Sequence, residues 1–231
     1  MRLLDSCLSC GILQTGILIG AFMKLRMFAV VTALPALSAC QYKAEPLTVA
    51  TYNVYSSYEG KLPGKYLLYV DGTKLNKPIK PSDYNCAAHT FPLELGNSFS
   101  GSVRQTFGNL VSEIELVQQP VDREQLKSRG ARGMIIVRGE DVSARLRVVP
   151  GFWSAAMDTE VEIAASITVD GPNGRLLGTT VSGDGNGQAD AGVMCEGGAK
   201  SLNQSAEDAM KEVLGRLGEA LTNSDRVRRG S

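Results

Sequence analysis

The fold of this chain is decided by VSARLRVV at residues 142–149, TEVEIAASITV at residues 159–169 and RLLGTTVS at residues 175–182. Apolar and polar residues alternate through the first two stretches, which predicts strands with one buried and one exposed face. The tetrapeptide GPNG at residues 171–174 predicts a tight turn between the second stretch and the third. Together the three stretches predict an antiparallel meander.

Strands and helices are also predicted outside the meander. Short apolar runs predict further strands at residues 66–70, 89–95, 114–117 and 133–137. Residues 98–110 and 205–221 carry apolar side chains at helical spacing, with Ser205 expected to cap the second helix. This order predicts an α+β two-layer sandwich, with a mostly antiparallel or mixed sheet and two helices packed on one face.

A signal sequence precedes this domain. The chain reads MKLRMFAVVTALPALSAC from Met23 to Cys40, with Lys24 and Arg26 ahead of an apolar run and LSAC at its end. This is the layout of a secretory signal. The apolar run of about 11 residues is shorter than the ~20 needed to span a bilayer. An ordinary cleaved signal or a short membrane helix is the alternative.

Residues 23–40 resemble a bacterial lipoprotein signal peptide that ends in a lipobox. In that family the cysteine receives a diacylglyceryl group, the peptidase cuts before it, and the new N-terminus is acylated. The resemblance implies that Cys40 is the lipidated first residue of the mature protein and that its acyl chains anchor it stably. Gln41, where an aspartate would favour the inner membrane, points to the outer membrane and a domain that faces the periplasm.

The sequence divides into four parts on this basis. Residues 1–39 are the leader and signal peptide, and residues 1–22 either lie upstream of a true start at Met23 or lengthen the signal. We expect residues 40–65 to be a lipid-anchored tether, residues 66–222 a single α+β domain, and residues 223–231 a disordered basic tail. The chain has 24 basic and 24 acidic residues, a balance that does not indicate a nucleic-acid partner.

The cysteines indicate a disulfide. Cys7 and Cys10 are lost with the leader, and Cys40 is lipidated. Cys86 and Cys195 remain as an even pair in an oxidising compartment, so we expect them to be bonded to each other, with two free thiols as the alternative.

Catalytic and metal-binding patterns are scarce. His89 is the single histidine, and none of the common hydrolase, zinc-protease or P-loop motifs occurs. We therefore expect no enzyme activity, no cofactor and no metal. The sequence GDGNGQAD at residues 183–190 is weakly similar to a phosphate loop and to a calcium loop, but residues 183–198 are expected to form a flexible surface loop tied by Cys195.

Aromatic residues are the candidates for binding a partner. Phe152 and Trp153 follow VPG between two predicted strands, so they form either an exposed tip that binds a partner or a pair folded back on the sheet end. Tyr66 and Tyr69 belong to a group of tyrosines that predicts a partner-facing or membrane-facing patch, unless they are ordinary strand residues.

The lipobox and the order of elements resemble small outer-membrane lipoproteins that act as auxiliary components of ABC-type lipid transport or lipopolysaccharide assembly. That resemblance implies a non-enzymatic accessory subunit, anchored to the membrane by its lipid, that binds an envelope protein. Its sheet edge or its aromatic loops would bind that partner. The alternative is a module that binds a small ligand or a lipid in a cleft between helices and sheet.

Overall fold

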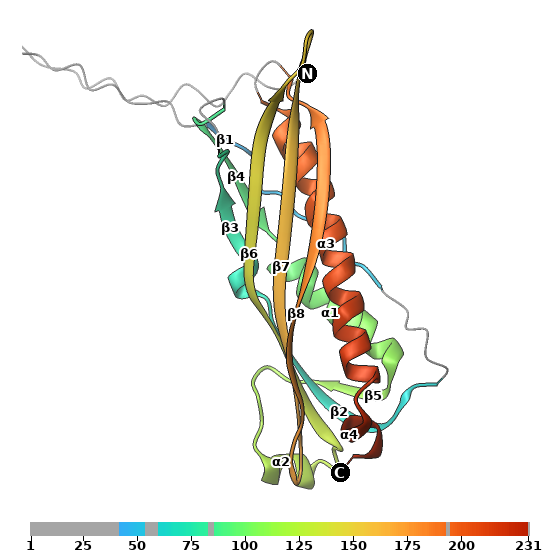
Figure 1. Cartoon of the computed structure of the whole chain (residues 1–231). Helices are drawn as coiled ribbons and strands as arrows, with labels where there is room; N and C mark the ends of the chain where they lie inside the picture. The colour runs from blue at the N-terminus through green and yellow to red at the C-terminus, as the bar shows by residue number, and fades with distance from the viewer. Residues whose placement is uncertain (1–41, 54–59, 83–85, 193–194, 231) are drawn as a thin grey trace, which may run out of the picture. The chain divides into compact units, whose positions relative to one another are not determined.

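The computed structural model describes residues 42–53, 60–82, 86–192 and 195–230. The larger of two sheets is mixed and has five strands in the order β5-β2-β6-β7-β8 (Figure 1). These strands are β2 (Leu62–Asp71), β5 (Val111–Leu116), β6 (Gly133–Pro150), β7 (Ala155–Gly171) and β8 (Gly174–Asp190). Helices α1 (Gly96–Leu110) and α3 (Gly197–Thr222) pack on one of its faces, so the expected α+β sandwich is confirmed.

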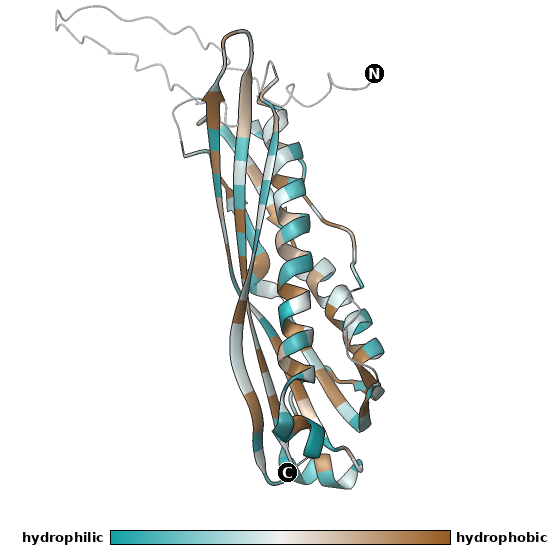
Figure 2. Cartoon of the chain, turned by 45° about the vertical axis from the view of Figure 1, so that its right-hand side comes forward, coloured by the Kyte–Doolittle hydropathy of each residue, from teal (hydrophilic) through white to brown (hydrophobic). Residues whose placement is uncertain are grey.

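The predicted meander is confirmed as β6-β7-β8. Both pairings are antiparallel, and Gly171 opposite Gly174 closes the β7–β8 turn. Every second residue of β7 from Met157 to Val169 is buried against the helices. Figure 2 shows the resulting alternation of hydrophilic and hydrophobic residues along these strands. The period of two in the sequence therefore sets which face of the meander is buried.

The other half of the large sheet is parallel, and the middle of β2 and the start of β6 are covered on both faces. β2 pairs in parallel with β5 on one side and with β6 on the other. A short helix, α2 (Arg123–Ser128), lies on the face opposite α1, where Leu126 packs with Leu67 and Met134. Parallel strands are normally buried on both faces, which explains their continuous apolar runs.

A smaller sheet holds the segment that precedes β2. Its strands, in the order β1-β4-β3, are β1 (Tyr42–Lys43), β3 (Asn76–Ile79) and β4 (His89–Glu94), and the 3-10 turn η1 (Thr73–Leu75) leads into β3. Leu47 bridges Leu93, and Val49 is 5% exposed. The expected tether over residues 40–65 is therefore wrong for its described parts, because residues 42–53 pack onto the domain and β2 begins at Leu62. Apolar contacts of this segment and backbone hydrogen bonds from Ala44 and Leu47 to β4 dock it.

Residues 49–53 also cross the helix layer. The Tyr52 backbone N–H donates to Ser102 Oγ on α1 at 2.9 Å, and the Lys211 ammonium of α3 lies 5.0 Å from the centroid of the Tyr52 ring. Burial raises the pKa of Tyr52 to about 12, and a hydrogen bond to Glu207 adds to the rise. The segment therefore holds both helices through one tyrosine.

We expect a late tyrosine titration that Tyr52→Phe reduces by one group, while Tyr66, whose pKa burial also raises, still titrates late. The folded state holds the Tyr52 proton more tightly than the unfolded chain, whose tyrosines titrate near 10. This contribution to stability is therefore full below pH 10 and is lost as the pH rises through about 12. Ultraviolet titration of tyrosinate in the native and the denatured chain measures both states. Identical native curves for wild type and Tyr52→Phe, scaled for tyrosine number, would contradict the assignment.

The glycine-rich stretch forms the end of β8 and the start of α3, so the loop expected over residues 183–198 is wrong for residues 183–190 and 197–198. Of its described part, residues 191–192 and 195–196 lie between the two elements. Gly183, Gly185 and Gly187 face α3. A Cβ added at Gly185 would overlap the carbonyl oxygen of Ser205 and lie 2.6 Å from the Ala209 nitrogen. These glycines are needed because the helix backbone lies directly on the strand.

Ser205 is not the cap of α3, because the helix begins two turns earlier at Gly197. Its side chain is fully buried, and its Oγ lies 2.6 Å from Thr159 Oγ1 on β7. The hydroxyl also donates to the carbonyl oxygen of Ser201, one turn earlier. Buried hydroxyls need such partners, and this one joins helix to sheet.

The tail expected over residues 223–231 is wrong for residues 225–229, which form helix α4 (Asp225–Arg229). Ser224 Oγ caps the helix by accepting from the Val227 N–H, and Val227 is fully buried. The Tyr66 hydroxyl donates to the Val227 carbonyl at 3.2 Å, and Arg132 Nη2 donates to the Arg228 carbonyl at 2.6 Å. The buried Val227, the serine cap and the hydrogen bonds from Tyr66 and Arg132 order a segment whose arginines otherwise suggest a solvated tail.

Candidate functional site

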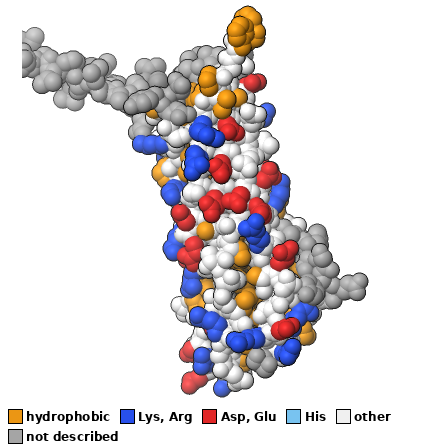
Figure 3. Space-filling model, viewed as in Figure 1, with side chains coloured by type: hydrophobic (Ala, Val, Ile, Leu, Met, Phe, Trp, Pro, Cys, Tyr) orange, Lys and Arg blue, Asp and Glu red, His pale blue; other side chains and the backbone are white. Residues whose placement is uncertain are grey.

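An aromatic tip ends the β6–β7 hairpin. The Gly151 N–H donates to the Ser154 carbonyl at 2.8 Å, which closes a four-residue turn. Phe152 and Trp153 are its two central residues. Phe152 is 89% exposed and Trp153 is 93% exposed. Their rings meet edge to face with centroids 4.8 Å apart. Figure 3 shows hydrophobic side chains gathered at this projecting end. Of the two arrangements that the sequence allows, the structure therefore has the exposed tip.

Opposite charges pair on the exposed face of the hairpin behind this tip. Arg145 lies 3.3 Å from Glu160, and Arg147 lies 3.4 Å from Asp158, across β6 and β7. Exposed pairs of this kind contribute little to stability. They do leave this part of the hairpin close to neutral.

The two tyrosines expected to form a partner-facing or membrane-facing patch do not share a face of the sheet. Tyr66 is fully buried on the helix side of β2, so a role for it in binding a partner is wrong. Tyr69 is half-buried on the opposite face, against the cluster that contains Leu67 and Leu126. Residues three apart on a strand point to opposite faces, and this parity excludes a shared tyrosine patch.

β8 is an edge strand with outward-facing backbone groups. It pairs only with β7 within the described part of the chain. The Ser182 carbonyl accepts from Arg216 Nη1 at 2.8 Å, and the Asp184 N–H donates to Glu212 Oε2 at 2.7 Å, both on α3. The backbone groups of even-numbered residues therefore point away from β7, and the unbroken register extends this to Asn186 and Gln188.

Asn186 and Gln188 are exposed, and the sequence interpretation missed them as edge residues because it placed them in a loop. The sequence does contain a strand pattern at this position, because glycine alternates with a polar residue from Gly183 to Gln188. Alternation with a period of two predicts a strand even where glycine replaces the apolar residue, provided that a neighbouring backbone packs closely on that face.

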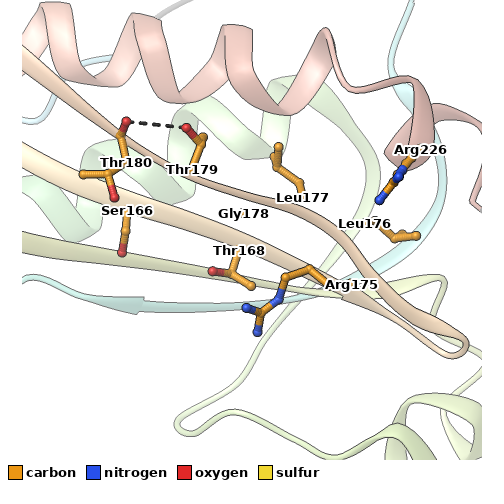
Figure 4. Close-up of a pocket in the computed structure, with 9 residues that line it drawn as sticks. All are labelled: Ser166, Thr168, Arg175, Leu176, Leu177, Gly178, Thr179, Thr180 and Arg226. Atoms are coloured by element: carbon orange, nitrogen blue, oxygen red, sulfur yellow. Dashed lines mark hydrogen bonds between the residues drawn. The ribbon is translucent and has the colours of Figure 1, made fainter.

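A surface depression of about 590 Å³ lies at the other half of β8 (Figure 4). Its walls come from β7, β8 and α4 and comprise Ser166, Thr168, Arg175, Leu176, Leu177, Gly178, Thr179, Thr180 and Arg226. Arg175 is held by Asp170 at 3.0 Å. Hydroxyl and guanidinium groups dominate this wall. It is not the apolar cleft between helices and sheet that a lipid-binding module would need.

The disulfide expected between Cys86 and Cys195 is present, with Cα atoms 6.0 Å apart. It ties the turn before β4 to the segment between β8 and α3. Both cysteines have positive φ angles, 64° at Cys86 and 58° at Cys195. Cys40 lies outside the described residues, so its lipidation stays a prediction. None of the helices in the described ranges has the length and apolar character that crossing a membrane requires.

No protein-family model and no curated protein matches this chain. Solved structures resemble it with low identity. A protein from Xanthomonas campestris of the family DUF330 is 7% identical, with 78% of this chain and 96% of that chain covered at a TM-score of 0.47. A neuraminyllactose-binding hemagglutinin homolog from Helicobacter pylori is 10% identical, with coverage of 78% and 97% and a TM-score of 0.45. A minor lipoprotein from Acinetobacter baumannii is 10% identical, with coverage of 72% and 91% and a TM-score of 0.30.

The polar residues of the glycine-rich stretch do not form the loop that a calcium or phosphate site would need. Asp184, Asn186, Gln188 and Asp190 follow one another along one face of a straight strand, about 6.6 Å apart at each step. A calcium loop instead wraps its oxygen ligands around one point. Among the described residues, no group of three or more His, Cys, Asp or Glu side chains is placed to hold a metal ion.

Proposed function

We propose that this protein is a non-enzymatic, lipid-anchored envelope protein that serves as an accessory or assembly subunit and binds a protein partner in the periplasm. The lipobox supports the anchor, through Cys40, in the outer membrane. The observation that best supports binding of a protein partner is the open edge of β8.

The edge of β8 suits the addition of a strand. α3 occupies the backbone groups at Ser182 and Asp184 through Arg216 and Glu212, and the stretch at residues 186–189 continues beyond them. It ends at Asp190, whose carbonyl oxygen lies against Gly197 at the start of α3. Proteins usually protect long edges with charge, bulges or a covering element. Here the side chains beside the edge at residues 186 and 188, on the face opposite α3, are uncharged amides, which can bond to side chains of a partner strand. An extended segment of the partner would hydrogen-bond to this stretch as a sixth strand.

Gln188→Pro tests this edge, because proline removes the outward N–H without removing a bond to β7. Gln188→Thr is the matched control, since threonine keeps the N–H and favours a strand. We expect the proline variant to lose at least about tenfold of its crosslinked partner in the native envelope, while the threonine variant keeps it. Thermal unfolding checks that both variants fold. Equal recovery of the partner with both variants would exclude the edge as the docking site.

A further inference from the structure

Exposed apolar side chains gather at one end of the described domain. Five large hydrophobic residues of the described chain are exposed, and their exposed fractions are 53% for Tyr42, 51% for Leu116, 42% for Val149, 89% for Phe152 and 93% for Trp153. Val149, Phe152 and Trp153 belong to the tip of the β6–β7 hairpin. Tyr42 belongs to β1, and Figure 1 shows β1 toward the same end of the domain.

Short contacts connect Tyr42 to this end. The Tyr42 N–H donates to the Ala88 carbonyl at 3.1 Å, and the nearby Cys86 is bonded to Cys195. On the other side of the disulfide, the Ala191 N–H donates at 2.7 Å to the carbonyl of Ala155, the first residue of β7 after the tip. β1, the disulfide and the base of the tip therefore lie together.

The lipid anchor enters the domain at this end. Cys40 is two residues before Tyr42, and two residues span at most about 7 Å even when fully extended. Acyl chains on Cys40 therefore bring a bilayer surface to the end of the domain that carries the tip. This step rests on the anchor in the proposed function, but it does not depend on a partner at β8.

We infer that Phe152 and Trp153 insert into the interfacial region of the same bilayer that holds the acyl chains of Cys40. Tryptophan is favoured at this depth because its ring is apolar while its N–H can bond to water or headgroups. The tip contributes two aromatic rings on a narrow turn. That is far less surface than the roughly 800 Å² per partner of a typical protein interface.

Charge has a small role in this contact. Arg145 and Arg147 behind the tip are paired with Glu160 and Asp158. Insertion should therefore depend on the apolar side chains, and replacing anionic with zwitterionic lipids should change it little. A contact driven by basic residues would instead weaken strongly without anionic lipid.

Trp153 is the single tryptophan of the chain, so intrinsic fluorescence reports on the tip alone. The native lipoprotein is reconstituted into vesicles of phosphatidylethanolamine and phosphatidylglycerol. Lipids brominated on their acyl chains quench tryptophan that is in the bilayer, and acrylamide quenches tryptophan that is in water. We expect brominated lipid to quench Trp153, and acrylamide quenching to fall about threefold relative to the protein in solution.

Matched variants identify the cause of this effect. Phe152→Ser should restore acrylamide access to Trp153, whereas Leu116→Ser, which changes an exposed apolar residue away from the tip, should have no effect. Unchanged acrylamide access in vesicles would overturn the inference. Shielding of Trp153 that needs envelope proteins in addition to lipid would also overturn it, in favour of a protein pocket.

Two separate measurements distinguish this inference from the proposed function. Mass spectrometry of Cys40 reports acylation, and recovery of the partner by the Gln188 variants reports the β8 edge. If Cys40 is not acylated, the proposed anchor is wrong. The same quenching experiment, with vesicles added to the protein, then tests whether the tip inserts into a bilayer without the anchor. If Trp153 stays in water there too, bilayer insertion is wrong whatever the partner data show.

Discussion

Replacing Gly185 with alanine will lower the free energy of unfolding by at least about 2 kcal/mol. The added Cβ would overlap the Ser205 carbonyl oxygen and lie 2.6 Å from the Ala209 nitrogen. Both atoms belong to the backbone of α3, so no side chain can rotate away to make room. The helix has to lift from β8, which opens the packed contact along the strand.

Gly108→Ala is the matched control, because it makes the same chemical change at an exposed position of α1 where an added Cβ meets nothing within 4 Å. Alanine is favoured over glycine in helices, so this variant should be as stable as wild type or up to about 1 kcal/mol more stable. Urea unfolding followed by circular dichroism measures both changes. If Gly185→Ala unfolds at the wild-type midpoint, the close strand–helix contact is wrong.

Loss of the Cys86–Cys195 disulfide is expected to destabilise the domain by about 2–5 kcal/mol. The bond closes a loop with a sequence separation of 109, which restricts the unfolded chain strongly in the chain-entropy model. In the folded state it joins the small sheet to the segment that leads into α3. We expect the Cys86→Ser/Cys195→Ser double variant to unfold at a clearly lower urea concentration than the oxidised wild type.

A second pair of substitutions separates the crosslink from the backbone. Both cysteines have positive φ angles, a region that glycine enters without strain. The Cys86→Gly/Cys195→Gly variant should therefore lose less stability than the serine variant, by about 1 kcal/mol or more. Reduced wild type should behave like the serine variant. Equal midpoints for oxidised and reduced wild type would show that the disulfide does not stabilise the domain.

The meander could be predicted from sequence because its apolar residues alternate at residues 142–148 of β6 and 161–169 of β7. The same reasoning stopped too early in β8, because Gly183, Gly185 and Gly187 have no side chain to show the apolar half of the pattern. The missing apolar surface is supplied by the backbone and small residues of α3. The hydropathy pattern of one segment gives no information about a helix from elsewhere in the chain that packs on it.

The candidate binding surfaces also differ in how far local sequence predicts them. The exposed tip at Phe152 and Trp153 follows from local information, since two strands joined by a short turn leave the turn residues outside. The burial of Tyr66 and the ordering of Val227 depend on each other across a sequence separation of 161. Contacts at that separation leave no periodic trace in either segment. Sequence patterns alone therefore assigned Tyr66 to a surface and Val227 to a disordered tail.

The hydrogen bond between Tyr66 and Val227 has a consequence for export. A chain that crosses a membrane from its N-terminal side delivers β2 long before the residues of α4 arrive. Until then, the Tyr66 hydroxyl lacks its acceptor, and β2 also waits for β6, its parallel neighbour from Gly133 onward. In an exported protein of the kind proposed here, the central strand of the parallel half would lack these partners for most of the translocation. The domain would then complete its core only after the α4 segment has arrived.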